Sequence, residues 1–284
     1  MDRKFSLTLI EAQKRASIFL EENGFDGQLA RQYWLLLFDW SLTDYILKLN
    51  QPVSSEQEVA YRDAIERIVR HEPIQYIAGY AEFMDERFKV TTDTLIPRED
   101  TAGLVELADT FLSDKPTADV LDIGTGTGII PIMIAKRYPN ATVMACDISP
   151  GALEVAEFNR KYHQVDIEFL ESDLFAQINS DKRFDLIISN PPYISEDELE
   201  LMDESVKRFE PKSALFAENK GLAIYQRLAL ECQDFIKANG LILLEIGFRQ
   251  AEAVSEIFQE QFPTAKISIS QDFNLHNRYV SIQL

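Results

Sequence analysis

The strongest structural signal in this chain is the segment Asp119-Val120-Leu121-Asp122-Ile123-Gly124-Thr125-Gly126-Thr127-Gly128. Its first five residues are mostly apolar and predict a buried strand. The glycines that follow allow the backbone to adopt positive φ and to approach a ligand closely. Residues near 129–137, rich in Ile, Met and Ala, then predict a helix. A strand, a glycine loop and a helix in this order are typical of a doubly wound sheet.

The spacing of the glycines limits the class of ligand that this loop can bind. A dinucleotide-binding loop, G-x-G-x-x-G, would place its third glycine at the position of Ile129. Here the third glycine comes one residue early, and the tighter loop is less suited to a pyrophosphate. With an acid just before it, the loop resembles motif I of S-adenosylmethionine (SAM) methyltransferases. We therefore expect the following residues to bind that cofactor: Asp122, Gly124, Thr125, Gly126, Thr127 and Gly128.

Strands and helices alternate after Pro116. Strands are predicted near 119–123, 142–147, 166–170, 184–189, 241–246, 265–270 and 278–283. Helices are predicted near 129–137, 150–162, 219–238 and 248–260, after a helical run from Thr101 to Leu112. This alternation predicts an α/β fold with a Rossmann-like sheet, as in class I SAM methyltransferases.

The N-terminal quarter has a different pattern. Helical periodicity from about residue 5 to 75 predicts a small bundle, with Ser41 and either Ser54 or Ser55 as helix caps. Glu72-Pro73 breaks the pattern, and aromatic and β-branched residues follow. Phe83 to Val90 could form a hairpin that turns at Asp85-Glu86. The expected domains are a helical bundle over 1–75, a hairpin linker over 76–96 and a methyltransferase domain over 97–284.

Two further acids follow predicted strands, at the sheet edge where open α/β folds bind ligands. Asp147 ends the second strand and could accept hydrogen bonds from both ribose hydroxyls, although a strand-end turn would also explain it. Asp173 follows the third strand and could bind the adenine amino group, with Leu174 and Phe175 beside the ring. A capping Asp would look the same.

The fourth strand ends in Asn190-Pro191-Pro192-Tyr193. The prolines lack an N–H and stop the strand. The amide oxygen of Asn190 and the Pro191 carbonyl are two acceptors, and Tyr193 supplies a flat ring. They could hold a planar NH2 group, whereas the simpler interpretation is a Pro-rich turn. A methyl-donor loop at the same edge favours the first interpretation and predicts SAM-dependent N-methylation.

Composition limits the other possibilities. The chain has 284 residues, 28 Lys and Arg against 47 Asp and Glu, and a net charge of −19. Such a surface repels nucleic acid unless a basic patch is present, and the sequence has no long Lys/Arg run. Two cysteines, Cys146 and Cys232, and three histidines predict neither a disulfide framework nor a metal site. We expect a cytoplasmic protein without a signal peptide or membrane span.

From about residue 70 to its end, the chain resembles the N5-glutamine methyltransferases of peptide chain release factors, the HemK/PrmC family. The matching segments are Glu72–Gly79, Glu82-Phe83, Leu95–Thr101, Leu104–Glu106, the glycine loop, Asp147, Asn190–Ile194, Phe209–Pro211, Gly221-Leu222, Glu245–Gly247, and Asp272 with Arg278. Departures are Asp85 in place of a common Gly, Glu99 in place of Pro, and Leu174 in place of an aromatic residue.

The resemblance implies a reaction. SAM would methylate the side-chain amide nitrogen of the glutamine in a release-factor Gly-Gly-Gln motif and leave as S-adenosylhomocysteine. The N-terminal domain would help to bind the release factor, or would only stabilise the enzyme. Arg98 could orient Asp100 or another acid near the donor site, or form a structural ion pair. Glu210 could line the substrate channel or a surface turn.

Two rival functions stay open. One is a different methyl acceptor, either a ribosomal-protein glutamine or an exocyclic amine of a nucleic-acid base. The other, the least favoured, is a non-catalytic binding protein. The intact glycine loop, Asp147 and Asn190 argue against that last possibility.

Overall fold

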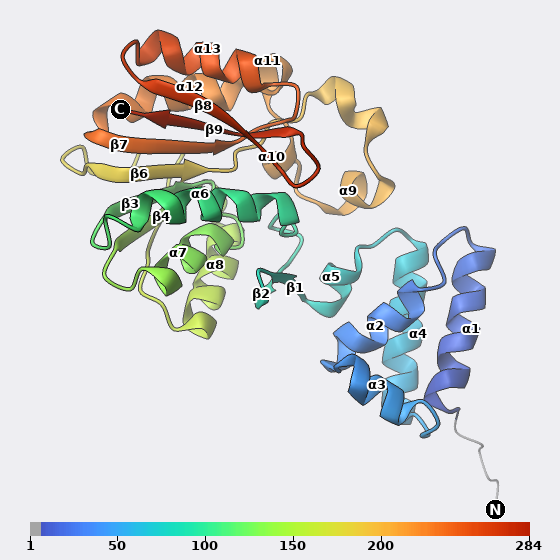
Figure 1. The fold of residues 1–284 in the computed structure, drawn as a ribbon. Coiled ribbons are helices and arrows are strands. Elements are labelled where there is room, and N and C mark those ends of the chain that lie inside the picture. The colour runs from blue at the N-terminus through green and yellow to red at the C-terminus, as the bar shows by residue number, and fades with distance from the viewer. Residues whose placement is uncertain (1–6) are drawn as a thin grey trace, which may run out of the picture. The chain divides into compact units, whose positions relative to one another are not determined.

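The computed structural model describes residues 7–284, which form two compact units. One unit comprises the described residues up to Gly79 together with Asp203–Phe209. The other comprises Tyr80–Met202 and Glu210–Leu284. Figure 1 labels the elements of both units. Among the described helices, none has the length and apolar character needed to cross a bilayer.

The first unit is helical, as its sequence predicts. Its elements are α1 (Leu9–Glu22), α2 (Leu29–Phe38), α3 (Leu42–Lys48), α4 (Ser55–Val69), α5 (Ile74–Ala78) and α9 (Glu204–Phe209). The side chains of Ser41 and Ser54 accept backbone N–H bonds at the starts of α3 and α4, so Ser54 rather than Ser55 is the second cap. The predicted helix start near residue 5 lies outside the described residues.

Aromatic stacking and a proline shape this helical unit. The rings of Trp34 and Tyr61 stack with centroids 4.2 Å apart, and the Tyr61 hydroxyl donates to the Ala30 carbonyl at 2.9 Å. The predicted break at Glu72-Pro73 is present, since α4 ends at Val69, but a further short helix, α5, begins directly after Pro73 and extends the helical region beyond residue 75. Proline is tolerated at a helix start because the first N–H groups have no intrahelical partner.

The predicted hairpin is present. It consists of β1 (Tyr80–Phe83) and β2 (Glu86–Lys89), paired antiparallel. Its turn residues are Met84 and Asp85, with φ of 49° and 62°, one residue earlier than predicted. A two-residue turn of this kind requires positive φ at both central positions. The hairpin contacts α8 (Pro150–His163), where the Asn159 side chain bonds the Lys89 N–H at 2.7 Å and the Lys89 carbonyl at 3.1 Å.

The second unit is built on a seven-stranded sheet. Its strands are β3 (Asp119–Ile123), β4 (Thr142–Asp147), β5 (Glu168–Glu171), β6 (Phe184–Ser189), β7 (Ile236–Glu245), β8 (Lys266–Gln271) and β9 (Asn277–Gln283). They lie in the order β5-β4-β3-β6-β7-β9-β8. The first five are parallel, and β9 is antiparallel to both β7 and β8. The predicted doubly wound α/β fold is confirmed.

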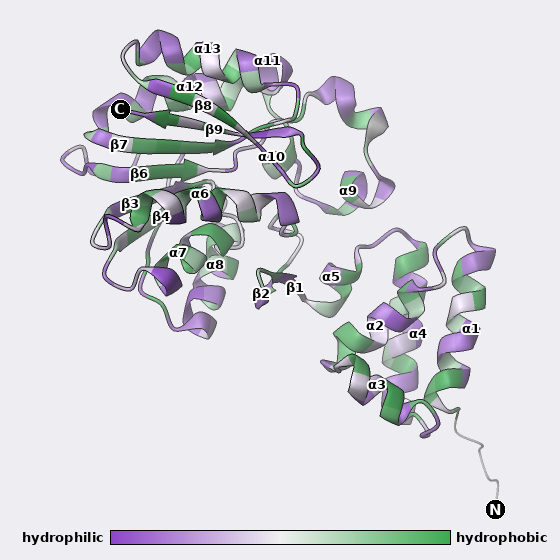
Figure 2. Cartoon of the chain, in the orientation of Figure 1, coloured by the Kyte–Doolittle hydropathy of each residue, from purple (hydrophilic) through white to green (hydrophobic). Residues whose placement is uncertain are grey.

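Helices cover both faces of this sheet (Figure 1). The helices of this unit are α6 (Ala102–Leu112), α7 (Ile129–Arg137), α8, α10 (Lys212–Leu215), α11 (Glu218–Gly221), α12 (Ala223–Glu231) and α13 (Ala251–Gln261), and its 3-10 helices are η1 (Glu99–Thr101), η2 (Glu196–Leu201) and η3 (Cys232–Asp234). Along β6, Leu186 and Ile188 pack with α6 and α7, whereas Ile187 packs with α12 and α13. Strand side chains alternate between faces, so a strand covered on both sides is apolar throughout. Figure 2 shows β7 and β9 as mostly hydrophobic and the helices as two-sided.

The predicted helix over 219–238 was wrong in its extent. Asn219 and Lys220 adopt left-handed backbone angles, so α12 begins only at Ala223. The last residues of the predicted helix, from Ile236 on, belong to β7 instead. Ile236 pairs with Phe184 of β6, and the Phe184 N–H donates to the Phe235 carbonyl at 2.8 Å. Pairing between distant segments here overrides the local helical pattern.

Candidate active site

The carboxyl ends of β3, β4, β5 and β6 lie at one edge of the sheet, because these strands are parallel neighbours. After β3 the chain continues into β4, which lies on one side of β3 in the sheet, whereas β6 lies on the other side of β3. Such a reversal is where open α/β sheets bind ligands. Ile123 is paired with Ser189, so the glycine loop and Asn190 leave the sheet side by side. The Ser189 hydroxyl donates to the Ile123 carbonyl at 2.7 Å and joins the two strand ends.

The glycine loop folds back over the end of β4. The Gly124 and Thr125 N–H groups both donate to the Cys146 carbonyl, at 2.9 and 3.0 Å. Gly126, with φ of 54°, donates its N–H to the Asp147 carboxylate at 2.8 Å. Gly128, with φ of 81°, starts α7, and a Cβ there would lie 3.2 Å from the Ala156 Cβ. Glycine is therefore required for both conformation and close packing.

Asp147 joins the loop to the next helix. Its second carboxylate oxygen accepts the Ser149 N–H at 2.9 Å, and the Ser149 hydroxyl accepts the Ala152 N–H at the start of α8. Burial raises the pKa of the Asp147 carboxyl, while its backbone hydrogen bonds oppose that rise. The carboxyl also lines the cavity at this edge.

Asp122 is fully buried beneath the loop. Hydrogen bonding from the Thr125 side chain lowers the pKa of Asp122 and only partly offsets the effect of burial. Burial raises the pKa of Asp122 to about 7. Asp122 is not on the cavity wall and supports the loop from below. Thr125 itself lines the cavity.

The cavity has a volume of about 340 Å³, within the range of small-molecule sites. It brings together most residues predicted from sequence, namely Arg98, Gly124, Thr125, Gly126, Thr127, Asp147, Asp173, Leu174, Asn190, Pro191 and Pro192. Five predicted residues are not on its wall, namely Asp122, Gly128, Phe175, Tyr193 and Glu210. The sequence assigned no role to Asp93 and Thr94, from the segment after β2, or to Thr101, and all three also line it.

The predicted adenine contacts are only partly at the cavity. Asp173 lines it, but one of its carboxylate oxygens is paired with the Arg227 guanidinium at 2.8 Å. Leu174 lines it as well, with φ of 49°. The expected position of Phe175 was wrong, because its ring stacks on Phe235 in the core, with centroids 4.8 Å apart.

Arg98 and Glu210 form an ion pair with each other. The Glu210 side chain is buried, and its second oxygen accepts the Ile96 N–H at 3.3 Å. Arg98 therefore does not pair with Asp100, which is paired with Arg278 at 3.4 Å. Glu210 thus fastens the segment before η1 and does not line the cavity.

Tyr193 lies beside the cavity and packs against the core that contains α12 and α13. Its backbone carbonyl accepts a hydrogen bond from the Gln250 amide nitrogen, Nε2, at 2.9 Å. Burial is the main cause that raises the pKa of Tyr193 to about 12, so the phenol stays neutral.

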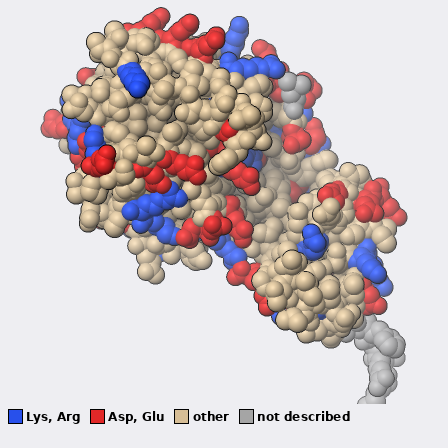
Figure 3. Space-filling view, viewed as in Figure 1, with Lys and Arg blue, Asp and Glu red and all other residues tan. Residues whose placement is uncertain are grey.

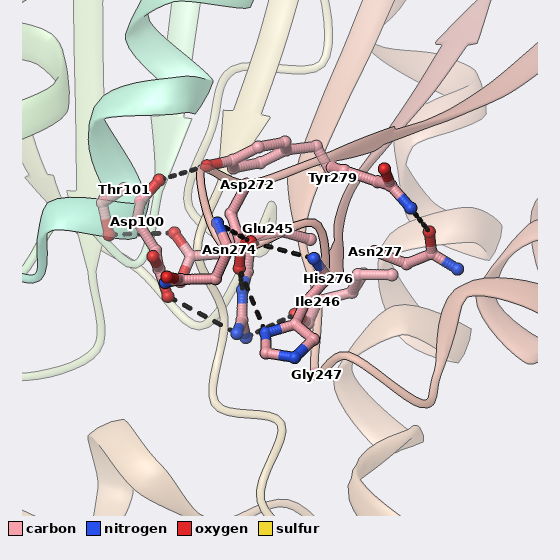
Figure 4. Close-up of polar contacts among 12 residues, drawn as sticks. Asp100, Thr101, Glu245, Ile246, Gly247, Asp272, Asn274, His276, Asn277 and Tyr279 are labelled. Carbon is pink, nitrogen blue, oxygen red and sulfur yellow. Dashed lines mark hydrogen bonds and ion pairs between the residues drawn. The ribbon is translucent and has the colours of Figure 1, made fainter.

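Asn190 is held by two residues that sequence reasoning assigned no role. Its side-chain NH2 donates to the Thr101 hydroxyl at 3.2 Å, and that hydroxyl donates to the Glu245 carboxylate at 2.8 Å. Figure 4 shows Thr101 and Glu245 facing each other from η1 and the end of β7. The sequence could have indicated Glu245, because it is an acid at the carboxyl end of a buried strand, as Asp147 is.

The comparisons with known proteins agree with this geometry. Residues 102–256 match the Methyltransferase small domain, and residues 11–79 match the PrmC N-terminal domain. Fold and site thus define a methyltransferase. Release factor glutamine methyltransferase of Lactococcus lactis subsp. lactis (strain IL1403) is 43% identical over 256 residues, 90% of each chain. The protein of the same name from Enterococcus faecalis (strain ATCC 700802 / V583) is 41% identical over 263 residues, 93% of this chain and 94% of that one.

This chain therefore belongs to the release factor glutamine methyltransferase family. A more distant similarity concerns the fold alone. The hMettl16 catalytic domain, solved in complex with MAT2A 3'UTR hairpin 1, is 13% identical and has a TM-score of 0.55 over 88% of this chain and 90% of that one.

Proposed function

We propose that this protein transfers a methyl group from SAM to the side-chain amide nitrogen of the glutamine in a release-factor Gly-Gly-Gln motif. The observation that carries this proposal is the position of Asn190, which lies beside the glycine loop with its NH2 group turned toward Thr101. Family membership supplies the substrate class, since the relatives are named for release factor glutamine methylation.

The cofactor assignment follows from the cavity wall. Residues 124–127 would surround SAM from one side, since all four line the cavity. Asp147 would accept the ribose hydroxyls with the lone pairs that its two N–H bonds leave free. Asp173 and Leu174 would contact the adenine, and Asp122 and Gly128 would support the loop. When bound, SAM supplies an electrophilic methyl carbon on a positively charged sulfur.

The residues after β6 would hold the acceptor. The Asn190 side-chain oxygen and the Pro191 carbonyl would accept the two N–H bonds of the glutamine amide, with Pro192 and Tyr193 shaping the surroundings. An amide nitrogen is a poor nucleophile because its lone pair is delocalised. Two fixed acceptors orient it and stabilise the positive charge that grows on nitrogen. The transfer would form a new N–CH3 bond, leave the S–CH3 electron pair on sulfur and release the extra proton from nitrogen to solvent.

Protein is favoured over nucleic acid as the substrate. The net charge is −19, and on the face in Figure 3 the Lys and Arg side chains are scattered among acidic groups. Tight binding of a phosphate backbone requires clustered basic residues. The helical unit would contribute to binding the release factor, whose function places the reaction in the cytoplasm. No sequence-specific contact with nucleic acid is expected.

Labelled methyl transfer tests this proposal. Purified release factor incubated with the enzyme and labelled SAM should become labelled, whereas its Gly-Gly-Gln to Gly-Gly-Ala variant should not. Parallel reactions should contain ribosomal proteins or RNA as acceptors. Equal labelling of both release-factor forms, or labelling only of RNA or ribosomal protein, would refute the substrate assignment.

A further inference from the structure

A buried series of hydrogen bonds ends at the Asn190 side chain. It runs from the Asn190 NH2 to the Thr101 hydroxyl and from that hydroxyl to the Glu245 carboxylate, over 3.2 and 2.8 Å. Thr101 and Glu245 are each 2% exposed. The three residues come from three elements, namely the end of β6, η1 and the end of β7.

This series of hydrogen bonds has a fixed direction. An ionised carboxylate can only accept hydrogen bonds, so the single hydrogen of the Thr101 hydroxyl is committed to Glu245. The Thr101 oxygen can then only accept. The amide of an Asn presents either NH2 or C=O after a 180° rotation of nearly the same shape. Only its NH2 can face Thr101, and its C=O must therefore face the other way.

We propose that Thr101 and Glu245 are positioning residues that hold the Asn190 amide with its oxygen toward the methyl acceptor. This inference rests on the proposed function, in which that oxygen accepts an N–H bond from the substrate amide. A rotated Asn190 would direct an N–H at the substrate N–H. The acceptor would be lost and two donors would face each other, which is costly in a water-poor site.

The 3-10 helix η1, which carries Thr101, is held in place by contacts with β9. The Tyr279 hydroxyl donates to the Asp100 carbonyl at 2.5 Å, and Arg278 bridges the carboxylates of Asp100 and Asp272, at 3.4 and 3.2 Å. Figure 4 shows Asp100, Thr101, Glu245 and Tyr279 converging from η1, β7 and β9. A Cβ on Gly103 would lie 2.2 Å from the Tyr279 hydroxyl oxygen, so glycine permits this close contact. Rigid support of this kind is what a precisely oriented group needs.

The direction of these hydrogen bonds depends on ionised Glu245. Burial raises the pKa of Glu245 to about 7, opposed by hydrogen bonding from Thr101, by the charge of Arg278 and by hydrogen bonding from the Asn190 side chain itself. The titratable or charged groups around it are Asp100 of η1, Tyr193 after β6, Tyr225 of α12, and Arg278 and Tyr279 of β9. A protonated Glu245 could donate to Thr101, which would free the Thr101 hydrogen to satisfy a rotated Asn190.

Substitutions at Thr101 test the inference with SAM and Gly-Gly-Gln release factor as substrates. Thr101→Val keeps the shape but removes the hydroxyl, and kcat should fall about 10- to 100-fold. Calorimetric SAM affinity should change far less than kcat, because Thr101 lines the cavity but is only 2% exposed. Thr101→Ser restores a hydroxyl and should recover most of the turnover. Thr110→Val is the matched control, because that exposed threonine of α6 bonds only its own helix, at the Glu106 carbonyl.

A double-mutant cycle separates positioning from general structure. In the Asn190→Ala background, which should itself lose most turnover, adding Thr101→Val should cost no more, because Thr101 acts through Asn190. The inference would be overturned if the loss of kcat in the double variant equalled the product of the losses in the two single variants. A near-normal kcat for Thr101→Val would also overturn it. A wild-type enzyme that does not label the Gly-Gly-Gln substrate would instead refute the proposed function.

Glu245→Gln gives an independent readout if Thr101→Val folds poorly. Wild-type kcat should decline as pH falls through about 7, where Glu245 takes up its proton. The glutamine variant has no such group, so this acid limb should disappear. An acid limb that persists unchanged in Glu245→Gln would remove Glu245 from the proposal.

Discussion

The Asp147 carboxylate accepts one backbone N–H from the glycine loop and one from Ser149. Asp147→Asn keeps the size but has a single acceptor oxygen, so its NH2 would face one of the two N–H groups. We expect SAM affinity to fall at least about tenfold, since hydrogen bonds to a charged group contribute about 1.5–3 kcal/mol. Calorimetric titration measures this affinity directly.

The control for that substitution is Asp185→Asn. Asp185 also accepts a backbone N–H, from Asp119 at 2.9 Å, but it lies at the amino-terminal part of β6, away from the cavity. The Asp185→Asn substitution should reduce the stability of the protein and leave its SAM affinity near that of the wild type. Unchanged affinity in Asp147→Asn would count against a role of Asp147 at the donor site.

Which residues could be found from sequence depends on how far each signal reaches. Asp147 and Asn190 were predicted because a polar residue directly after a buried strand is visible in the sequence. Glu245 satisfies the same rule and was assigned no role. Thr101 was beyond reach, because its two partners lie 89 and 144 positions away in the sequence. Contacts of that kind are set by strand order, which local patterns do not contain.

At the scale of elements, Gly221 fits the end of α11 against the segment after β6. Its φ is 80°, and a Cβ there would lie 1.9 Å from the Tyr193 carbonyl oxygen and 2.6 Å from the Gln250 side-chain nitrogen. Gly221→Ala must therefore displace backbone. We expect it to lower the free energy of unfolding by more than about 3 kcal/mol, measured by urea titration.

Gly24→Ala is the comparison variant. Gly24 has a similar φ of 83°, but a Cβ there meets nothing within 4 Å. Only the left-handed backbone is then penalised, by about 1–2 kcal/mol. If both variants lost the same stability, backbone conformation alone would explain Gly221 and the close approach to Tyr193 would be irrelevant.

Elements with strong local patterns were predicted well. β3, β4 and β6 begin and end where the sequence places them, because apolar runs bounded by polar or glycine residues leave little choice. The helix predicted over 219–238 failed where two left-handed residues and the pairing of Ile236 with β6 intervene. Similarly, the hairpin turn moved by one residue because positive φ at Met84 is not encoded in its side chain.

At the scale of the whole molecule, the helical region and the α/β sheet were both predictable from their periodicities. The return of the backbone to the helical unit at Asp203–Phe209 was not. This short segment follows η2 and carries no pattern that distinguishes it from a surface helix. Assigning such a segment to a unit requires the tertiary contacts themselves.

Two buried acids should make the stability of the whole protein depend on pH. Burial raises the pKa values of Asp122 and Glu245 to about 7, whereas in the unfolded state both lie near 4. Between these values the folded state binds more protons than the unfolded state. The stabilisation is therefore fully present below about pH 4 and is lost as pH rises through about 7, on the order of 2 to 4 kcal/mol for each carboxyl.

Comparison with neutral variants isolates this effect from other titrating groups. Asp122→Asn and Glu245→Gln remove the two carboxyl groups with little change in size. Their free energies of unfolding, measured by urea titration from pH 5 to 8, should rise relative to wild type as pH increases. If the two carboxyl groups were already ionised at pH 5, the difference in free energy of unfolding between variant and wild type would not change with pH. The assigned pKa values would then be wrong.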